Sequence, residues 1–168
     1  GYKVGLLSTV KILVDDVEFP ATHTTPDSIT INRYLSEMNK AGVEYCFMEV
    51  SSHGIAQKRT DALQFKGGLF TNLSHDHLDY HKTMQNYFAA KQLLFSDYLW
   101  QSNKNQKTAI VNIDDEWGKY IQVPNDCRLW TYGQAESDFK FQLVKEEFSF
   151  TEIEIKFESQ NYLLKTPL

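Results

Sequence analysis

The chain has 168 residues, of which 42% are hydrophobic and 23% are charged, and this length suits one ordinary core rather than several independent domains. The formal net charge is −5 with no block of like charges, which argues against nucleic acid or a membrane surface as a partner. No apolar run has membrane-spanning length, and two cysteines, Cys46 and Cys127, do not make a disulfide framework, so a reducing cytoplasm is predicted.

The first half of the chain alternates short apolar runs with a helical pattern. "VGLLSTV" predicts a strand, and "VKILVDDVEF" predicts a hairpin or an extended segment. Residues 28–40 carry apolar residues in helical rhythm, with Asp27 or Ser28 as the N-cap and Gly42 as the C-terminal stop. "EYCFMEV" predicts a buried strand, in which Cys46 would be a small buried hydrophobe. "GGLFTNL" predicts another strand.

The hydrophobic pattern of the second half changes after about residue 126. Residues 84–99 predict the strongest helix, and "TAIVNI" predicts a strand that ends in "DDE". After about residue 126 the pattern alternates with period two, which predicts antiparallel strands with "ESQN" as a turn. The predicted fold is therefore α/β, with a mostly parallel sheet flanked by helices in residues 1–125 and antiparallel strands in residues 126–168.

Three predicted strands end in unusually polar loops, "SSHGIAQKR", "SHDHLDYH" and "IDDE". Ligands of open parallel sheets bind beyond the carboxyl ends of strands, so we expect these loops to converge on one edge. Glu49 is a candidate cation ligand, because a buried carboxylate needs a partner, and His77 and Asp79 could add ligands. A salt-bridged or capping glutamate and an exposed loop histidine are the simpler alternatives.

Lys91 lies on the apolar face of the predicted helix, three or four residues from Tyr87, Phe88 and Phe95. Either its ammonium extends outward to water, or a partly buried amine is neutral and open to modification. "SSHGIAQKR" and "THTTPDS" offer hydroxyls, an amide and an arginine, which fit an anionic substrate or, more simply, helix caps. No G-x-x-x-x-G-K-[ST] pattern occurs, so these residues contain no phosphate-binding P-loop.

Five stretches, "HTTPDS", "MEVSSHGIAQKR", "FTNLSHDHLDYH", "YFAAK" and "VNIDDE", resemble the Mur ligase family in order and separation. The similarity is greatest to the members of this family that add a diamino acid to UDP-N-acetylmuramoyl-L-alanyl-D-glutamate. The resemblance implies a central ATPase domain of a cytoplasmic ligase of peptidoglycan synthesis. The family's P-loop, N-terminal uridine-binding domain and C-terminal domain are expected outside residues 1–168. We therefore expect a domain that is incomplete at both ends and inactive alone.

The resemblance also implies roles for individual residues. Glu49 and His77 match ligands of Mg²⁺, and Lys91 matches a lysine that forms a carbamate with CO₂ and helps to bind the ion. Asn112 matches a position facing ATP. The implied reaction passes the γ-phosphate to the D-glutamyl carboxylate, and the amine of meso-diaminopimelate or lysine then displaces phosphate. Positions that hold the UDP-N-acetylmuramoyl dipeptide are matched by Thr24, Thr25, Ser51, Gln57 and Arg59.

The same residues also support alternative functions. Another Mur or folate-type ligase would share the general chemistry. Residues 75–81 also loosely resemble the H-x-H-x-D-H zinc loop of metallo-β-lactamase-like hydrolases, although the last histidine stands one position too late and none follows His81. An exposed apolar sheet face or edge is expected where the P-loop helix is absent, and it would favour self-association.

Overall fold

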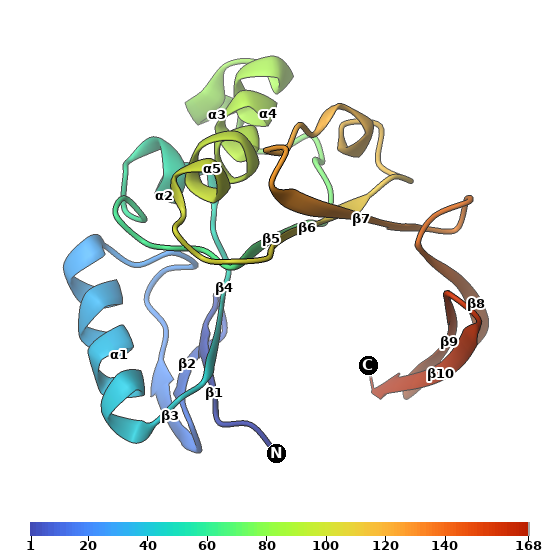
Figure 1. The fold of residues 1–168 in the computed structure, drawn as a ribbon, viewed down its shortest axis with the longest axis horizontal. Helices are drawn as coiled ribbons and strands as arrows, with labels where there is room; N and C mark the ends of the chain where they lie inside the picture. The colour runs from blue at the N-terminus through green and yellow to red at the C-terminus, as the bar shows by residue number, and fades with distance from the viewer. Residues whose placement is uncertain (168) are drawn as a thin grey trace. The chain divides into compact units, whose positions relative to one another are not determined.

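The computed structural model describes residues 1–167, and the chain divides into two compact units (Figure 1). The first unit comprises residues 1–63 and 89–93, and the second comprises residues 64–88 and the chain from Leu94 onward. Each unit is built around its own sheet.

A four-stranded sheet of order β3-β2-β1-β4 forms the first unit. Neighbours among β1, β2 and β3 pair antiparallel, as the predicted hairpin requires, and β4 pairs parallel to β1 with Met48 opposite Leu7. The strands are β1 (Val4–Leu7), β2 (Lys11–Val14), β3 (Val17–Pro20) and β4 (Tyr45–Met48).

Helix α1 (Ser28–Ala41) has the ends predicted from the sequence. The Asp27 carboxylate accepts hydrogen bonds from the backbone N–H groups of Ile29 and Thr30, both at 3.0 Å, and so satisfies two donors of the first turn. Gly42 ends the helix at φ 76°, a left-handed conformation that glycine adopts without strain. The apolar side of α1 and the sheet enclose a core of Leu7, Ile12, Val14, Ile31, Tyr34 and Met38.

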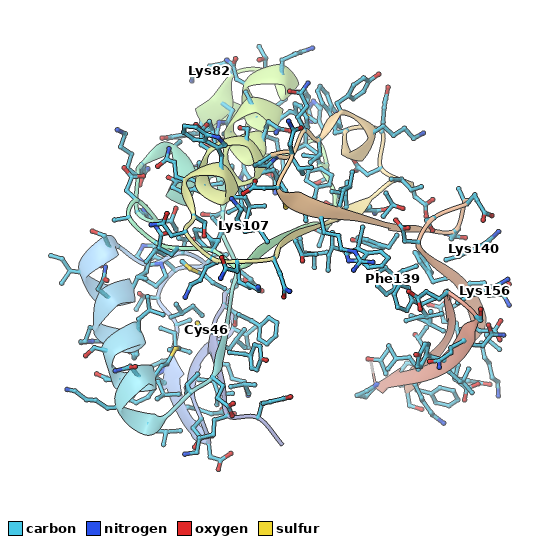
Figure 2. All side chains as sticks on the ribbon, viewed as in Figure 1. Cys46, Lys82, Lys107, Phe139, Lys140 and Lys156 are labelled. Atoms are coloured by element: carbon cyan, nitrogen blue, oxygen red, sulfur yellow. The ribbon has the colours of Figure 1, made fainter. Side chains whose placement is uncertain are left out.

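Strand β4 forms as predicted, but the prediction that it is buried is wrong. Tyr45, Cys46 and Phe47 are exposed, Phe47 to 63% (Figure 2 labels Cys46). Within residues 1–167 β4 pairs with β1 alone, so it is the edge strand of its sheet and presents the expected apolar edge. The surrounding chain still desolvates the Cys46 thiol and raises its pKa to about 11, which leaves it protonated at neutral pH.

The second unit contains a six-stranded mixed sheet of order β10-β9-β8-β7-β6-β5. Neighbours among β5, β6 and β7 pair parallel, and β8, β9 and β10 form an antiparallel meander. The prediction that antiparallel strands begin at residue 126 is wrong for β7, because period-two alternation reports one-sided burial and not strand direction. The strands are β5 (Gly67–Phe70), β6 (Lys107–Asn112), β7 (Cys127–Gly133), β8 (Phe139–Glu147), β9 (Phe150–Phe157) and β10 (Gln160–Pro167).

The helix predicted over residues 84–99 is interrupted. Helix α4 (Met84–Leu93) is followed by a π-helical segment (Leu94–Tyr98) and by α5 (Leu99–Gln101). A π turn is wider than an α turn, so it changes the spacing of the buried side chains along the helix. The other helical elements are α2 (Ser52–Ala56), α3 (Leu78–His81) and the 3₁₀ turn Gly118–Tyr120. No helix in residues 1–167 is long and apolar enough to cross a bilayer.

An ion pair between a buried lysine and an exposed aspartate anchors the start of β6. The Lys107 side chain is 4% exposed, and its Nζ lies 2.8 Å from Asp126 Oδ2 and 3.4 Å from the carbonyl oxygen of Ser102 (Lys107 is labelled in Figure 2). The hydrogen bond from Lys107 lowers the pKa of the Asp126 carboxyl below its usual range. Removing the carboxylate would leave a buried ammonium with one carbonyl partner.

We therefore expect Asp126→Asn to lower the melting temperature at pH 7. The pKa of Asp126 is lower in the folded than in the unfolded chain, so its stabilisation is present above the unfolded value of about 3.9 and is lost as the pH falls below it. Thermal unfolding followed by circular dichroism should show a constant difference from wild type between about pH 5 and 8, and a shrinking one below about pH 4. The exposed Asp16→Asn variant is the control, and an undiminished Asp126→Asn deficit at pH 3 would contradict the prediction.

Candidate functional site

Glu49 follows the last residue of β4 and is held at both its backbone and its side chain. Its backbone N–H donates to the carbonyl of Leu7 at 2.8 Å, and its carbonyl accepts from the Thr25 hydroxyl at 2.9 Å. Carboxylate oxygen Oε2 accepts from the backbone N–H of Thr9 at 2.8 Å and from its hydroxyl at 2.6 Å. Within the described residues Oε1 has no hydrogen-bond partner and no basic side chain pairs with Glu49.

Glu49 differs from the prediction in its burial and in its partners. Glu49 is exposed, so the premise of a buried carboxylate is wrong. The salt-bridge alternative finds no partner within residues 1–167. A carboxylate with one oxygen fixed and the other unbonded fits a hard divalent cation such as Mg²⁺, which prefers oxygen ligands.

Thr25 and Ser51 form hydrogen bonds with each other and with the backbone of Glu49. Thr25 is buried at 1% exposure, and its hydroxyl donates to the Glu49 carbonyl and accepts from the Ser51 N–H at 2.8 Å. The Ser51 hydroxyl caps α2 by accepting from the N–H of Gly54 at 3.0 Å. A Cβ on Gly54 would lie 2.6 Å from Thr25 Cγ2, so glycine permits this close packing. The Thr25 hydroxyl is thus occupied within the chain, and it shapes the loop that carries Glu49.

Arg59 and Gln57 complete this network from the far end of α2. Arg59 Nη1 donates to the Thr25 carbonyl at 2.7 Å, while its Nε and Nη2 donate to Gln57 Oε1 at 3.0 and 2.5 Å. A guanidinium has five N–H groups, so two are without a partner among the described residues. A half-buried arginine held in this way can bind a carboxylate or a phosphate.

The second unit carries His77, which has left-handed backbone dihedrals (φ 57°) and begins the short helix α3. Its N–H donates to Asp76 Oδ1 at 2.7 Å, and its ring meets the edge of Tyr87 at 5.7 Å between centroids. His81 is buried and stacks on Tyr87 at 5.1 Å. The aromatic contacts of Tyr87 therefore shape the loop, and burial raises the pKa of this tyrosine.

The side chains of residues 75–81, on which the zinc-loop alternative rests, form no three-ligand group in the described part of the chain. Within residues 1–167 no three His, Cys, Asp or Glu side chains are grouped so that they could hold a metal ion. His81 stacks on Tyr87, and Asp79 is exposed.

Asn112 ends β6 and joins two neighbouring loops. Its amide nitrogen donates to the Thr71 carbonyl at 2.8 Å, and its Oδ1 accepts from the N–H of Asp114 at 3.0 Å. Asp114 Oδ2 accepts from the N–H of Gln134 at 2.7 Å, and Asp115 Oδ2 accepts from that of Leu73 at 3.0 Å. These two aspartates thereby tie together the loops that follow β5, β6 and β7.

The sequence showed the two aspartates only as the end of a strand. The signal that could have identified their role is an Asp pair directly after a strand, since Asp side chains accept bonds from nearby loop N–H groups. The predicted convergence of polar loops holds for β5 and β6, which are adjacent and parallel. The prediction is wrong for the loop after β4, because β4 belongs to the four-stranded sheet and not to the sheet of β5 and β6.

Lys91 lies in α4 and is half-buried, one residue after the buried Ala90 and four after the buried Tyr87. This position agrees with an amine that is partly shielded from water.

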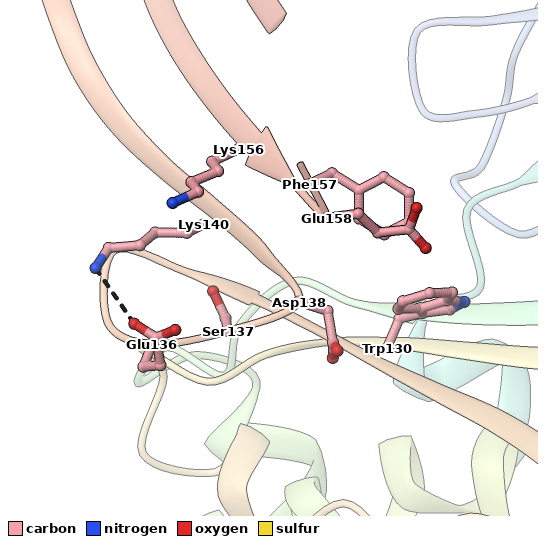
Figure 3. Close-up of a pocket in the computed structure, with 8 residues that line it drawn as sticks. All are labelled: Trp130, Glu136, Ser137, Asp138, Lys140, Lys156, Phe157 and Glu158. Carbon is pink, nitrogen blue, oxygen red and sulfur yellow. Dashed lines mark ion pairs between the residues drawn. The ribbon is translucent and has the colours of Figure 1, made fainter. Parts of the chain in front are cut away.

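A pocket of about 380 Å³ lies elsewhere in the second unit (Figure 3). Glu136 pairs with Lys140 at its rim at 3.6 Å, and Asp138 accepts from the N–H and hydroxyl of Thr131, both at 2.7 Å. None of the residues predicted for the functional site lines this pocket. Its lining residues are Trp130, Glu136, Ser137, Asp138, Lys140, Lys156, Phe157 and Glu158.

Comparison with known proteins gives consistent matches. Residues 2–168 match the family model described as "Mur ligase middle domain". The UDP-N-acetylmuramoyl-L-alanyl-D-glutamate--2,6-diaminopimelate ligase of Cytophaga hutchinsonii is 45% identical over 156 residues, which are 92% of this chain and 31% of that protein. The ligase of the same name from Bacteroides thetaiotaomicron is 47% identical over 149 residues, which are 88% of this chain and 30% of that protein.

Solved structures agree on the fold. A structure of a ligase with the same name superposes with a TM-score of 0.81 at 23% identity, over 99% of this chain and 34% of the other. A MurF structure from Acinetobacter baumannii superposes with a TM-score of 0.71 at 15% identity, over 97% of this chain and 32% of the other. The chain spans about a third of the length of the relatives that it matches.

Proposed function

The chain belongs to the Mur ligase family as a middle domain, and from this premise we propose that the whole protein is an ATP-dependent ligase of peptidoglycan synthesis. It joins UDP-N-acetylmuramoyl-L-alanyl-D-glutamate to 2,6-diaminopimelate in the cytoplasm. The observation that carries the proposal is the identity of 45–47% to three ligases that bear this name, over 88–92% of the chain. The same names favour diaminopimelate over lysine as the incoming amine.

In this proposal the network around Glu49 binds the acidic substrate. Arg59 offers its two remaining N–H groups to an anionic group of the UDP-N-acetylmuramoyl dipeptide, and the bonds to Gln57 and to the Thr25 carbonyl keep the guanidinium from rotating away. Thr24 is half-buried, its hydroxyl lies 2.9 Å from that of Thr9, and it is proposed as a further substrate contact, while Ser51 supports the loop. These residues orient the D-glutamyl carboxylate that accepts the γ-phosphate.

Glu49 is proposed as a ligand of Mg²⁺ through its unbonded Oε1, and His77 is proposed as a Mg²⁺ ligand from the resemblance in its loop. When bound, the ion neutralises charge on the phosphate and carboxylate oxygens. Lys91 as its carbamate is a further proposed anionic ligand. The N–C bond forms from the neutral amine and CO₂, and the proton is lost to water.

The nucleotide is proposed to bind beyond the carboxyl end of β6, near Asn112. Loops at this edge are held in place by Asp114 and Asp115, so the site is preorganised around backbone groups. A MurF ligase from Thermotoga maritima, which superposes on 98% of this chain with a TM-score of 0.63, is in complex with ADP. That complex supports nucleotide binding by this fold.

The proposal is tested with the whole purified protein, ATP, Mg²⁺ and UDP-N-acetylmuramoyl-L-alanyl-D-glutamate. We expect one phosphate released for each amide formed with diaminopimelate, measured by phosphate assay and by product mass. A preference for lysine would overturn the proposed acceptor while keeping the ligase. Phosphate release and ligation with a folate, or with a different muramoyl peptide only, would instead establish the alternative Mur or folate-type ligase.

A further inference from the structure

Thr9 lies in the turn between β1 and β2. Neither the sequence patterns nor the comparisons give this residue a role. The neighbouring Ser8 closes this turn, because its hydroxyl donates to the Lys11 carbonyl at 2.9 Å and accepts from the Lys11 N–H at 3.2 Å. The turn therefore has a fixed backbone, and Thr9 projects from it as an exposed residue.

Both donors of Thr9 meet the same oxygen. Its N–H and its hydroxyl lie 2.8 and 2.6 Å from Glu49 Oε2, across 40 residues of sequence. Hydrogen bonds to a carboxylate are charge-assisted and therefore strong. Two of them on one oxygen fix the rotation of the carboxylate group and leave Oε1 as the oxygen available to a cation.

The Thr9 hydroxyl also lies 2.9 Å from the Thr24 hydroxyl. A hydroxyl has one proton, and a carboxylate can only accept, so the Thr9 proton goes to Glu49 and Thr24 must donate to Thr9. The result is a directed chain from Thr24 through Thr9 to Glu49. It connects a residue proposed for substrate binding to one proposed for cation binding.

We propose that Thr9 is a positioning residue that holds Glu49 Oε2, so that Oε1 is presented to the divalent cation, and that it couples this carboxylate to Thr24. The inference rests on the proposed function, because it is there that Glu49 is a cation ligand. Thr9 itself touches neither substrate nor cation. Groups that orient a metal ligand in this way commonly change metal affinity when they are removed.

The test is Mn²⁺ binding to the whole protein, read from the loss of the free-ion electron paramagnetic resonance signal. Thr9→Val keeps the N–H and the shape but removes the hydroxyl, and we expect it to weaken Mn²⁺ binding between about tenfold and a hundredfold. Thr9→Ser restores a hydroxyl and should bind within about threefold of wild type. Thr166→Val, in β10, is the matched control and should bind as wild type does.

Activity supplies the second measurement. Thr9→Val should raise the Mg²⁺ concentration at half-maximal rate, and excess Mg²⁺ should restore the rate, which it would not do for a misfolded variant. The inference would be overturned if Thr9→Val bound Mn²⁺ as tightly as wild type, or if Thr9→Ser bound it as weakly as Thr9→Val. Either result would leave the proposed function intact. Absence of Mn²⁺ binding by the wild type, or full binding by Glu49→Gln, would overturn the role of Glu49 and the inference with it.

Discussion

Replacing Gly118 by alanine is expected to destabilise the second unit by about 3 kcal/mol or more, at the upper end of overpacking effects. A Cβ at this buried position would lie 1.8 Å from the carbonyl oxygen of Asn112 and 3.4 Å from Val111 Cγ1. The clashing atom belongs to the backbone of β6, which is paired on both sides by β5 and β7, so it cannot move without breaking the sheet. Urea unfolding followed by circular dichroism would measure the loss.

The neighbouring Lys119→Ala variant is the control, since Lys119 is exposed in the same 3₁₀ turn and its loss should cost no more than about 0.5 kcal/mol. The m-value should stay unchanged in both variants if the unfolded state is the same. A Gly118→Ala protein within about 1 kcal/mol of wild type would show that the turn can relax away from Asn112.

Replacing Lys91 by alanine is expected to have the largest effect on the chemistry. We predict that the protein gains about 44 Da, the mass of CO₂, in bicarbonate at neutral pH, because Lys91 is half-buried and the neutral form of an amine reacts with CO₂. Lys91→Ala should lose this gain, and the ligation rate of the whole protein should fall at least about a hundredfold, as is usual when a charge-stabilising group is removed. Intact-mass spectrometry and the phosphate assay measure the two effects.

Lys82→Ala is the matched control for the mass measurement, because Lys82 is an exposed lysine two residues before α4. Its variant should retain the gain. A gain that persists in Lys91→Ala would assign the carbamate to another lysine. No gain in the wild type would mean that this lysine is an ordinary ammonium and would remove it from the proposed ligands.

Parts of the site could be predicted because residues near in sequence decide them. The "EVSSHGIAQKR" stretch places Ser51, Gln57 and Arg59 around one short helix, and the Ser51 cap spans only three residues. Thr25 is brought to them from a separate loop, and its contact with Glu49 depends on the parallel pairing of β4 with β1. The role proposed for Thr9 also depends on a contact between residues far apart in the sequence, so no local pattern indicates it.

The sequence by itself determined the local elements, because caps and periodicity act over a few residues. Asp27 and Gly42 end α1 through bonds within one turn, and Glu158 and Ser159 of the predicted turn "ESQN" join β9 to β10, whereas Gln160 and Asn161 already belong to β10. The tertiary structure alone decided that β4 is an exposed edge, that β7 is parallel, and that Oε2 of Glu49 is held by Thr9. Burial, strand direction and contacts across 40 residues depend on which elements become neighbours, and local patterns do not carry that information.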